Sequence, residues 1–250
     1  MNNNEKLEKY QAKQLLVGKR LIRGKADNRV ALVAGAAALV LAFAGQLLYF
    51  NFGPGSSDPA LDVTQEPAAE APQNSSEVPS ADLAEARIWE GALNLNDQAI
   101  SLELDGVNAP QAVANFISLA QSGYYENVTC HRLTTAGIFV LQCGDPDGTG
   151  GGGPGYNFGP VENAPADDLY LEGTLAMARV GQDGNSMGSQ FFIVYGDSSI
   201  PSDSAGGYTV FGKITGGLDA VKAIADLGTS DGSSDASPVE PVIMSQISVK

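Results

Sequence analysis

Three polar side chains, set among large apolar ones, are the residues of this 250-residue sequence best suited to chemistry. The guanidinium of Arg132 is permanently charged, and the carboxamides of Gln142 and Gln190 both donate and accept hydrogen bonds. The strand-like segments that carry them contain no serine–histidine pair, metal-ligand cluster or phosphate-binding loop. This combination indicates a site that binds and twists a peptide rather than one that cuts it.

Three other kinds of chemistry are poorly supported by the residue patterns. Residues 184–188 match the G-x-S-x-G pattern of a hydrolase, but that motif needs a histidine downstream and the only histidine, His131, lies upstream. The glycine run at residues 148–155 lacks the Gly-Lys-Ser/Thr ending of a phosphate loop. One histidine and two cysteines offer no recognised metal-ligand spacing. We therefore expect a site that uses neither a metal nor another cofactor.

Several short blocks agree with one known family in order, spacing and residue identity. From about residue 87 to the C-terminus the chain resembles the cyclophilin family of peptidyl-prolyl cis-trans isomerases, in a membrane-anchored bacterial-like form. The blocks that carry the resemblance are His131-Arg132, Phe139, Gln142–Asp145, Ala176–Ala178, Gly188–Phe192 and Thr209–Lys213.

The resemblance implies rotation of X-Pro peptide bonds in proline-containing polypeptides, and so assistance to the folding of extracytoplasmic proteins. Arg132 matches the family's catalytic arginine, and Gln142 matches a catalytic neighbour that holds the substrate backbone. The further residues that the resemblance assigns to substrate binding are His131, Phe139, Met177, Ala178, Arg179, Gln190, Phe192, Ile200 and Tyr208.

The sequence also departs from the family pattern. The spacing from Arg132 to Gln142 is about two residues longer than usual, which enlarges the turn at residues 134–137. Ser199 stands near the place of a frequent pocket tryptophan, Tyr208 replaces a common histidine, and Arg179 replaces a common asparagine. These departures leave a second hypothesis open, a non-catalytic module or scaffold that binds proline peptides in the same groove.

The periodicity of residues 87–250 predicts a mainly β domain with two helices. Residues 87–95 and 99–104 alternate between apolar and polar, which predicts two strands joined by a tight turn. Helical spacing over residues 110–123 and 218–228 predicts one helix in each segment. The resemblance implies a more specific architecture, a closed eight-stranded antiparallel barrel capped by the two helices.

The two cysteines flank the proposed site residues. Cys130 precedes His131 and Cys143 follows Gln142, so the thiols lie opposite each other if these segments are neighbouring antiparallel strands. A disulfide is permitted outside the cytoplasm, and a bridge of this loop length stabilises a fold by about 3 kcal/mol in the chain-entropy model. Two buried free thiols are the alternative.

Residues 30–50 form an apolar run of 21 residues whose only strongly polar member is Gln46. A helix of this length spans about 30 Å, the thickness of a bilayer's hydrocarbon core. Residues 1–29 carry a net charge of +5, so the positive-inside rule places them in the cytoplasm and the remainder outside. We expect a single-pass cell-membrane protein; a signal peptide cleaved after Ala42-Phe43-Ala44 is the alternative.

Residues 51–86 are rich in Pro, Ser, Ala and acidic residues, with few large apolar side chains. Such a segment buries too little surface to offset the entropy of ordering, which predicts a disordered linker between the membrane and the domain. Beyond residue 30 the chain has a net charge of −20, so nucleic acid is not an expected partner.

Overall fold

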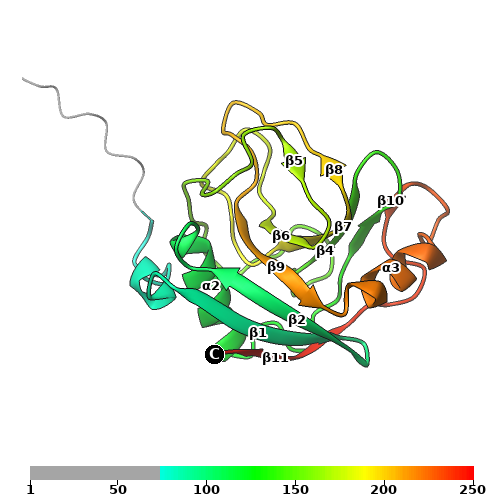
Figure 1. The fold of residues 1–250 in the computed structure, drawn as a ribbon, viewed down its shortest axis with the longest axis horizontal. Coiled ribbons are helices and arrows are strands. Elements are labelled where there is room, and N and C mark those ends of the chain that lie inside the picture. The colour runs from blue at the N-terminus through cyan, green and yellow to red at the C-terminus, as the bar shows by residue number, and fades with distance from the viewer. Residues whose placement is uncertain (1–73) are drawn as a thin grey trace, which may run out of the picture. The chain divides into compact units, whose positions relative to one another are not determined.

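The computed structural model describes residues 74–250, which fold around one large, curled antiparallel sheet (Figure 1). Its strands are β1 (Ile88–Leu95), β2 (Gln98–Asp105), β3 (Arg132–Thr134), β4 (Phe139–Cys143), β6 (Thr174–Met177), β7 (Phe191–Gly196), β9 (Val210–Gly216), β10 (Asp235–Ala236) and β11 (Met244–Val249). Two further strands, β5 (Leu169–Tyr170) and β8 (Ser198–Ser199), pair with each other apart from it. The helical elements are η1 (Ala81–Ala84), α2 (Pro110–Gln121) and α3 (Leu218–Leu227).

The large sheet runs in the order β10-β3-β4-β7-β6-β9-β2-β1-β11, so the expectation of a closed eight-stranded barrel is wrong. Within residues 74–250 the sheet has nine strands, and its edge strands β10 and β11 do not pair with each other. The sheet is therefore curled but open. The segment before β3 contacts the start of β11 through isolated backbone bonds, since the N–H of Cys130 donates to the carbonyl of Val242 at 2.8 Å and that of Met244 donates to the carbonyl of Val128 at 2.9 Å.

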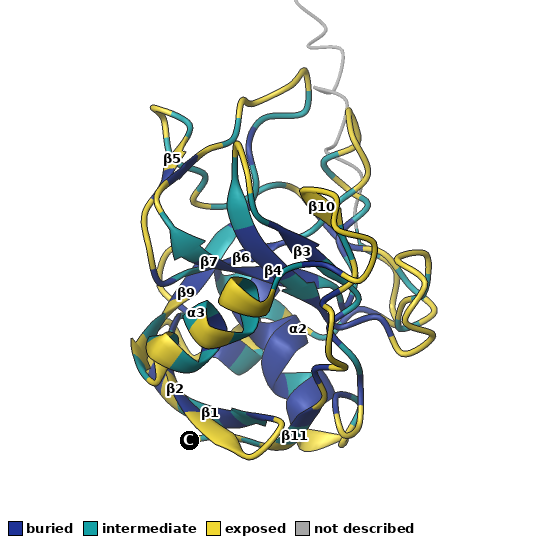
Figure 2. Cartoon of the chain, turned by 90° about the vertical axis from the view of Figure 1, so that its right-hand side faces the viewer, coloured by how far each residue is buried: buried dark blue, intermediate teal, exposed yellow. Residues whose placement is uncertain are grey.

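The predicted hairpin and both helices are confirmed. Strands β1 and β2 pair along their whole length around a turn at Asn96 and Asp97. Helix α2 starts at Pro110 and buries Val113, Phe116 and Ile117 in the main core. Figure 2 shows α2 as largely buried, whereas α3 keeps a broad exposed face. The sequence periodicity therefore located both helices, and burial distinguishes their roles.

A distant carboxylate satisfies the start of α2. No side chain at the helix's own N-cap position bonds its free N–H groups. Glu162 accepts from the backbone N–H groups of Gln111 and Ala112, both at 3.0 Å. An acidic group at this end also faces the positive end of the helix dipole. This contact ties the loop after residue 157 to the domain's most buried helix.

The last part of the expected linker belongs to the fold. Residues 74–86 contain η1, and the side chains of Val78 and Ala84 are buried in the main core. The indole N–H of Trp89 donates to the carbonyl of Ala84 at 2.8 Å, which anchors the segment at the start of β1. The prediction of disorder up to residue 86 is therefore wrong for residues 74–86, because two apolar side chains are enough to dock this short segment.

The expected membrane-spanning segment at residues 30–50 lies outside the described residues, as do the tail at 1–29 and most of the linker. Within residues 74–250, no helix has both the length and the apolar character that crossing a bilayer requires.

Cys130 and Cys143 are joined in a disulfide, one of the two alternatives that the sequence left open. Both residues are buried in the main core. The bridge links the segment before β3 to the end of β4, and each cysteine is adjacent in sequence to a proposed site residue. The cross-link therefore holds together the two strands that present Arg132 and Gln142.

Replacing both cysteines by alanine should lower the free energy of unfolding by about 3 kcal/mol, because the unfolded chain then loses a cross-link of 13 residues' separation. For a domain of this size that corresponds to a fall in melting temperature of roughly 10 °C. Thermal unfolding followed by circular dichroism measures it. A reductant should destabilise the wild type and leave the double variant unchanged; equal melting temperatures without reductant would contradict the prediction.

Candidate active site

The register of the sheet places the main site residues in one row. Arg132 on β3 lies opposite Gln142 on β4, and Gln142 lies opposite Phe192 on β7. Phe192 in turn lies opposite Ala176 on β6. Because residues directly opposite each other in a ladder share a face, a charged group, a carboxamide and an aromatic ring line up across three strands.

Hydrogen bonds fix the polar end of this row. Nη1 of Arg132 donates to Oε1 of Gln142 at 3.2 Å, and Nε2 of Gln142 donates to Oε1 of Gln190 at 2.9 Å. Gln190 then donates to the carbonyls of Gly150 and Gly152 at 3.0 and 2.8 Å. The predicted catalytic pair and the second glutamine therefore form one connected chain of hydrogen bonds.

The opposite side of Arg132 is held by Asp235 of β10. Nε donates to Oδ1 at 2.7 Å and Nη2 donates to Oδ2 at 2.8 Å, a bidentate ion pair. The hydrogen bonds with Asp235 raise the pKa of Arg132, and those with Arg132 lower the pKa of Asp235. Both side chains remain about half exposed, so the pair lies at the rim of the site.

A cavity of about 520 Å³ lies beside the guanidinium, with polar side chains along part of its lining and apolar side chains along the rest. The predicted residues that line it with Arg132 and Gln142 are His131, Ala178, Arg179, Phe192, Ile200 and Tyr208. Its apolar walls are backed by a small cluster of buried side chains that is distinct from the main core and is composed of Val140, Tyr170, Ala176, Phe192 and Val194. The structure thus brings most of the predicted residues together around one hollow.

Three predicted substrate-binding residues, Met177, Phe139 and Gln190, do not line this cavity; Gln190 lines the neighbouring hollow described below. Met177 is fully buried in the main core, because alternation along β6 turns it away from the face that carries Ala176. Phe139 packs on Tyr195 with ring centroids 5.9 Å apart, and its ring contacts Gly196. The register of β4 shifts between Phe139 and its successor, so the neighbours of Phe139 line the cavity in its place. Met177 and Phe139 therefore lie outside this cavity, and their roles in substrate binding stay predictions.

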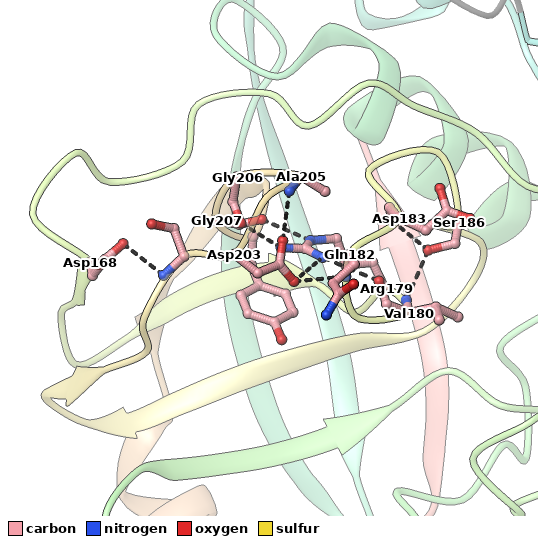
Figure 3. A network of polar contacts seen from close by, with 12 residues as sticks. Asp168, Arg179, Val180, Gln182, Asp183, Ser186, Asp203, Ala205, Gly206 and Gly207 are labelled. Atoms are coloured by element: carbon pink, nitrogen blue, oxygen red, sulfur yellow. Dashed lines mark hydrogen bonds and ion pairs between the residues drawn. The ribbon is translucent and has the colours of Figure 1, made fainter. Parts of the chain in front are cut away.

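A buried arginine also lines the cavity, and Figure 3 shows the polar network around it. The side chain of Arg179 is only 1% exposed, pairs with both carboxylate oxygens of Asp203 at 3.0 Å and donates to the carbonyl of Gly207 at 2.9 Å. Its guanidinium also lies 4.8 Å from the ring centroid of Tyr208. The contacts lower the pKa of Asp203 well below its usual range. This network fixes the loop that carries Ile200 and Tyr208.

His131 contributes a ring rather than a charge. Neither ring nitrogen has a hydrogen-bond partner within the described structure, and both are buried. Burial lowers its pKa most, the charge of Asp145 opposes this, and the charge of Arg132 lowers the pKa further. The imidazole is therefore neutral at physiological pH, and it lines the cavity as an uncharged ring.

A second hollow of about 500 Å³ continues from the first and shares Gln142, Gly150, Ala178 and Arg179 with it. Its glycine-rich wall is organised by Asp145, which accepts from the N–H groups of Asp147, Thr149 and Gly150 at 2.8, 2.9 and 2.5 Å. Burial opposes the charge of Asp145, but these bonds prevail and lower its pKa. The glycine run predicted as a loop thus forms a wall of the groove.

The arrangement suits binding rather than bond cleavage. The hydroxyl of Ser186, the serine of the G-x-S-x-G pattern, donates to the carbonyl of Asp183 at 2.7 Å and accepts from Val180 N–H at 2.8 Å, so it serves its own loop. Across residues 74–250, no three His, Cys, Asp or Glu side chains are grouped to hold a metal ion. What remains is a charged donor and two carboxamides beside an apolar cavity.

Sequence reasoning missed several residues of this cavity. Val140 could have been predicted, because alternation along β4 places it on the same face as Gln142. Asp235 and its two successors belong to a Ser/Asp/Gly-rich loop, whose sequence has no pattern that predicts a place in the cavity. The missed lining residues are Ile138, Val140, Thr149, Gly150, Asp235, Ala236 and Ser237.

Comparisons with known proteins agree with this geometry. A family model described as cyclophilin type peptidyl-prolyl cis-trans isomerase/CLD matches residues 92–249. A probable peptidyl-prolyl cis-trans isomerase B of Mycobacterium tuberculosis is 43% identical over 164 residues, which cover 61% of this chain and 51% of the relative. Peptidyl-prolyl cis-trans isomerase B of Bacillus subtilis is 42% identical over 128 residues, or 51% of this chain and 83% of the relative. The chain spans about half the length of the mycobacterial isomerase B relatives that it matches.

Solved structures show the same fold. A crystal structure of a cyclophilin type peptidyl-prolyl cis-trans isomerase from Cryptosporidium parvum matches with a TM-score of 0.55 and 30% identity, covering 66% of this chain and 98% of that one. A second structure of that protein, in the presence of the dipeptide Ala-Pro, matches with a TM-score of 0.54. With the family model covering residues 92–249, from the middle of β1 to the end of β11, this chain belongs to the cyclophilin-type peptidyl-prolyl cis-trans isomerase family.

Proposed function

We propose that the chain is a peptidyl-prolyl cis-trans isomerase that acts on proline-containing polypeptides. The observation that carries the proposal is the position of Arg132 at the rim of an apolar cavity, in hydrogen-bonded contact with Gln142. The names of the bacterial relatives support the same activity, as does the related Cryptosporidium parvum protein, whose structure was solved in the presence of Ala-Pro.

The reaction is a rotation about a partial double bond. The barrier is about 18–20 kcal/mol, because the nitrogen lone pair is delocalised into the carbonyl. Twisting the bond localises that lone pair, so the proline nitrogen becomes a hydrogen-bond acceptor only near the transition state. A donor that contacts this nitrogen therefore stabilises the twisted state more than either planar isomer, which is the requirement for catalysis.

The residues divide this work between binding and rotation. The proline ring enters the apolar cavity against Phe192 and Ile200, where burial supplies affinity without chemistry. Gln142 and Gln190 present carboxamides to the peptide backbone next to the cavity. Arg132 is always charged, and one of its N–H groups donates a hydrogen bond to the proline nitrogen of the twisted peptide bond.

We also propose that the chain is anchored in the cell membrane by residues 30–50, with the isomerase domain outside the cytoplasm and acting on extracytoplasmic clients. Support comes from the 21-residue apolar run and from the basic flank that precedes it. A disulfide between Cys130 and Cys143 fits an oxidising compartment.

Arg132→Ala should reduce kcat by about a hundredfold, the usual cost of removing one transition-state donor. KM should change little, because Phe192 and Ile200, against which the proline ring packs, are unchanged. Exchange spectroscopy by NMR on an X-Pro peptide measures both. If wild type and variant bind the peptide equally and neither accelerates exchange, the protein is a proline-peptide binding module instead.

Asp203→Asn should raise KM by about fivefold and leave kcat nearly unchanged. The reason is that Arg179 then lacks its counter-charge, so the loop with Ile200 and Tyr208 loosens and both isomers bind less well. The same peptide assay measures this effect. Asp183→Asn is the matched control, since that carboxylate bonds only within its own loop at Asn185; an unchanged KM for Asp203→Asn contradicts the role of the network.

Cell fractionation tests the membrane proposal. The full chain should stay in the membrane pellet after an alkaline wash, and a version beginning at residue 51 should be soluble, because the apolar run is then missing. Protease added to spheroplasts should digest the domain of the full chain. Recovery of a soluble chain that begins just after Ala44 would show instead that the segment is a cleaved signal peptide.

A further inference from the structure

The ion pair between Asp235 and Arg132 joins two segments that are 103 residues apart. Asp235 lies on β10, where it pairs with Thr134 of β3, so its side chain is a diagonal neighbour of Arg132 across the ladder. Both carboxylate oxygens accept from the guanidinium, at 2.7 and 2.8 Å. The same two residues line the apolar cavity, so this contact is part of the site's rim.

The loop that presents Asp235 is organised independently of Arg132. Ser230 and Ser237 bond through backbone atoms at 2.8 Å and through hydroxyls at 2.9 Å, which closes the base of the loop. Inside it, Ser233 Oγ donates to the carbonyl of Asp235 at 3.1 Å. Thr135 N–H donates to the carbonyl of Ser234 at 2.9 Å, which fastens the loop to the end of β3. These hydrogen bonds fix the position of Asp235, so its carboxylate can hold the guanidinium of Arg132 in place.

The hydrogen bonds of the guanidinium show what the contact leaves available. An arginine head carries five N–H bonds. Asp235 takes those of Nε and one on Nη2, and Gln142 takes one on Nη1. Among residues 74–250, these contacts leave one N–H on each terminal nitrogen for a bound peptide. Asp235 and Gln142 thus hold the guanidinium on two sides.

We propose that Asp235 is a positioning residue for Arg132, an inference that rests on the proposed isomerase function. A free arginine side chain loses rotamer entropy when it is held in one position. Strand β3 pairs with β4 at each of its three residues, and the carboxylate of Asp235 holds the guanidinium from the other side of β3. Asp235 orders the donor before substrate arrives, so its removal slows rotation without weakening peptide binding.

The test uses the full chain, kept in detergent micelles, with Asp235→Asn and Asp235→Glu. Asp235→Asn removes the charge at constant shape and should lower kcat about three- to fivefold with KM unchanged, the range for a half-exposed ion pair. Asp235→Glu keeps the charge and should restore kcat to within about twofold of wild type. Asp231→Asn is the matched control. It removes the same charge from the same loop, where the carboxylate of Asp231 accepts from the N–H of Ser233.

A second measurement detects the ion pair between Asp235 and Arg132 without an activity assay. In spectra of arginine-labelled chain, the Nε–H of Arg132 should exchange slowly with solvent in wild type and in Asp231→Asn, and fast in Asp235→Asn. If the wild type is active and Asp235→Asn changes neither kcat nor the Arg132 signal, the positioning role is wrong and the proposed function stands. So does a fall in melting temperature with no change in kcat, since that marks a merely structural contact. An inactive wild type with a protected Arg132 signal overturns the proposed function, and the positioning role with it.

Discussion

The antiparallel register of β3, β4 and β7 is the constraint on which the rest of the site depends. It sets Arg132 opposite Gln142 and Gln142 opposite Phe192, so that a cation, a carboxamide and an aromatic ring lie in one row. A shift of one residue in any of these strands would turn its side chain into the main core. The disulfide between Cys130 and Cys143 lies directly beside this row and opposes such a shift.

The same alternation separates two apolar clusters. Leu141 and Ile193 face the main core together with α2, whereas their neighbours Val140, Phe192 and Val194 back the cavity. The sheet thus uses one face for stability and the other for binding. Loops complete the binding face, and each is fixed by a carboxylate: Asp145 holds the glycine-rich wall and Asp203 holds Arg179. Some of the many acidic residues of this domain therefore fix loops and are not merely part of a solvated surface.

Elements with strong local sequence patterns could be predicted. Features whose position depends on contacts with distant segments could not. The β1–β2 hairpin and helix α2 were predicted because alternation and helical spacing report directly on one buried face. Arg132, Gln142 and Phe192 were predicted because their types and spacing match a family. The position of Phe139 outside the cavity follows a local register shift in β4 that is invisible in the sequence, whereas alternation around Ala176 indicates that Met177 faces the main core.

Other features had no local signal at all. The pairing of Asp235 with Arg132 depends on a loop more than a hundred residues downstream, in a segment rich in Ser, Asp and Gly. The open sheet differs from the expected barrel because β10 is only two residues long, a property set by how the loop after α3 docks. Residues 74–86 looked like linker because their composition is polar, yet Val78 and Ala84 suffice to dock them.

The central claim is that a guanidinium held beside an apolar cavity lowers the barrier to rotation of a bound X-Pro bond. The most direct measurement is the interconversion rate of the cis and trans signals of a proline peptide, observed by NMR with catalytic amounts of the chain. The account predicts that exchange between the two sets of signals becomes fast enough to detect while most of the peptide is free. Peptide signals that shift on binding, with an interconversion rate no faster than in buffer, would contradict it.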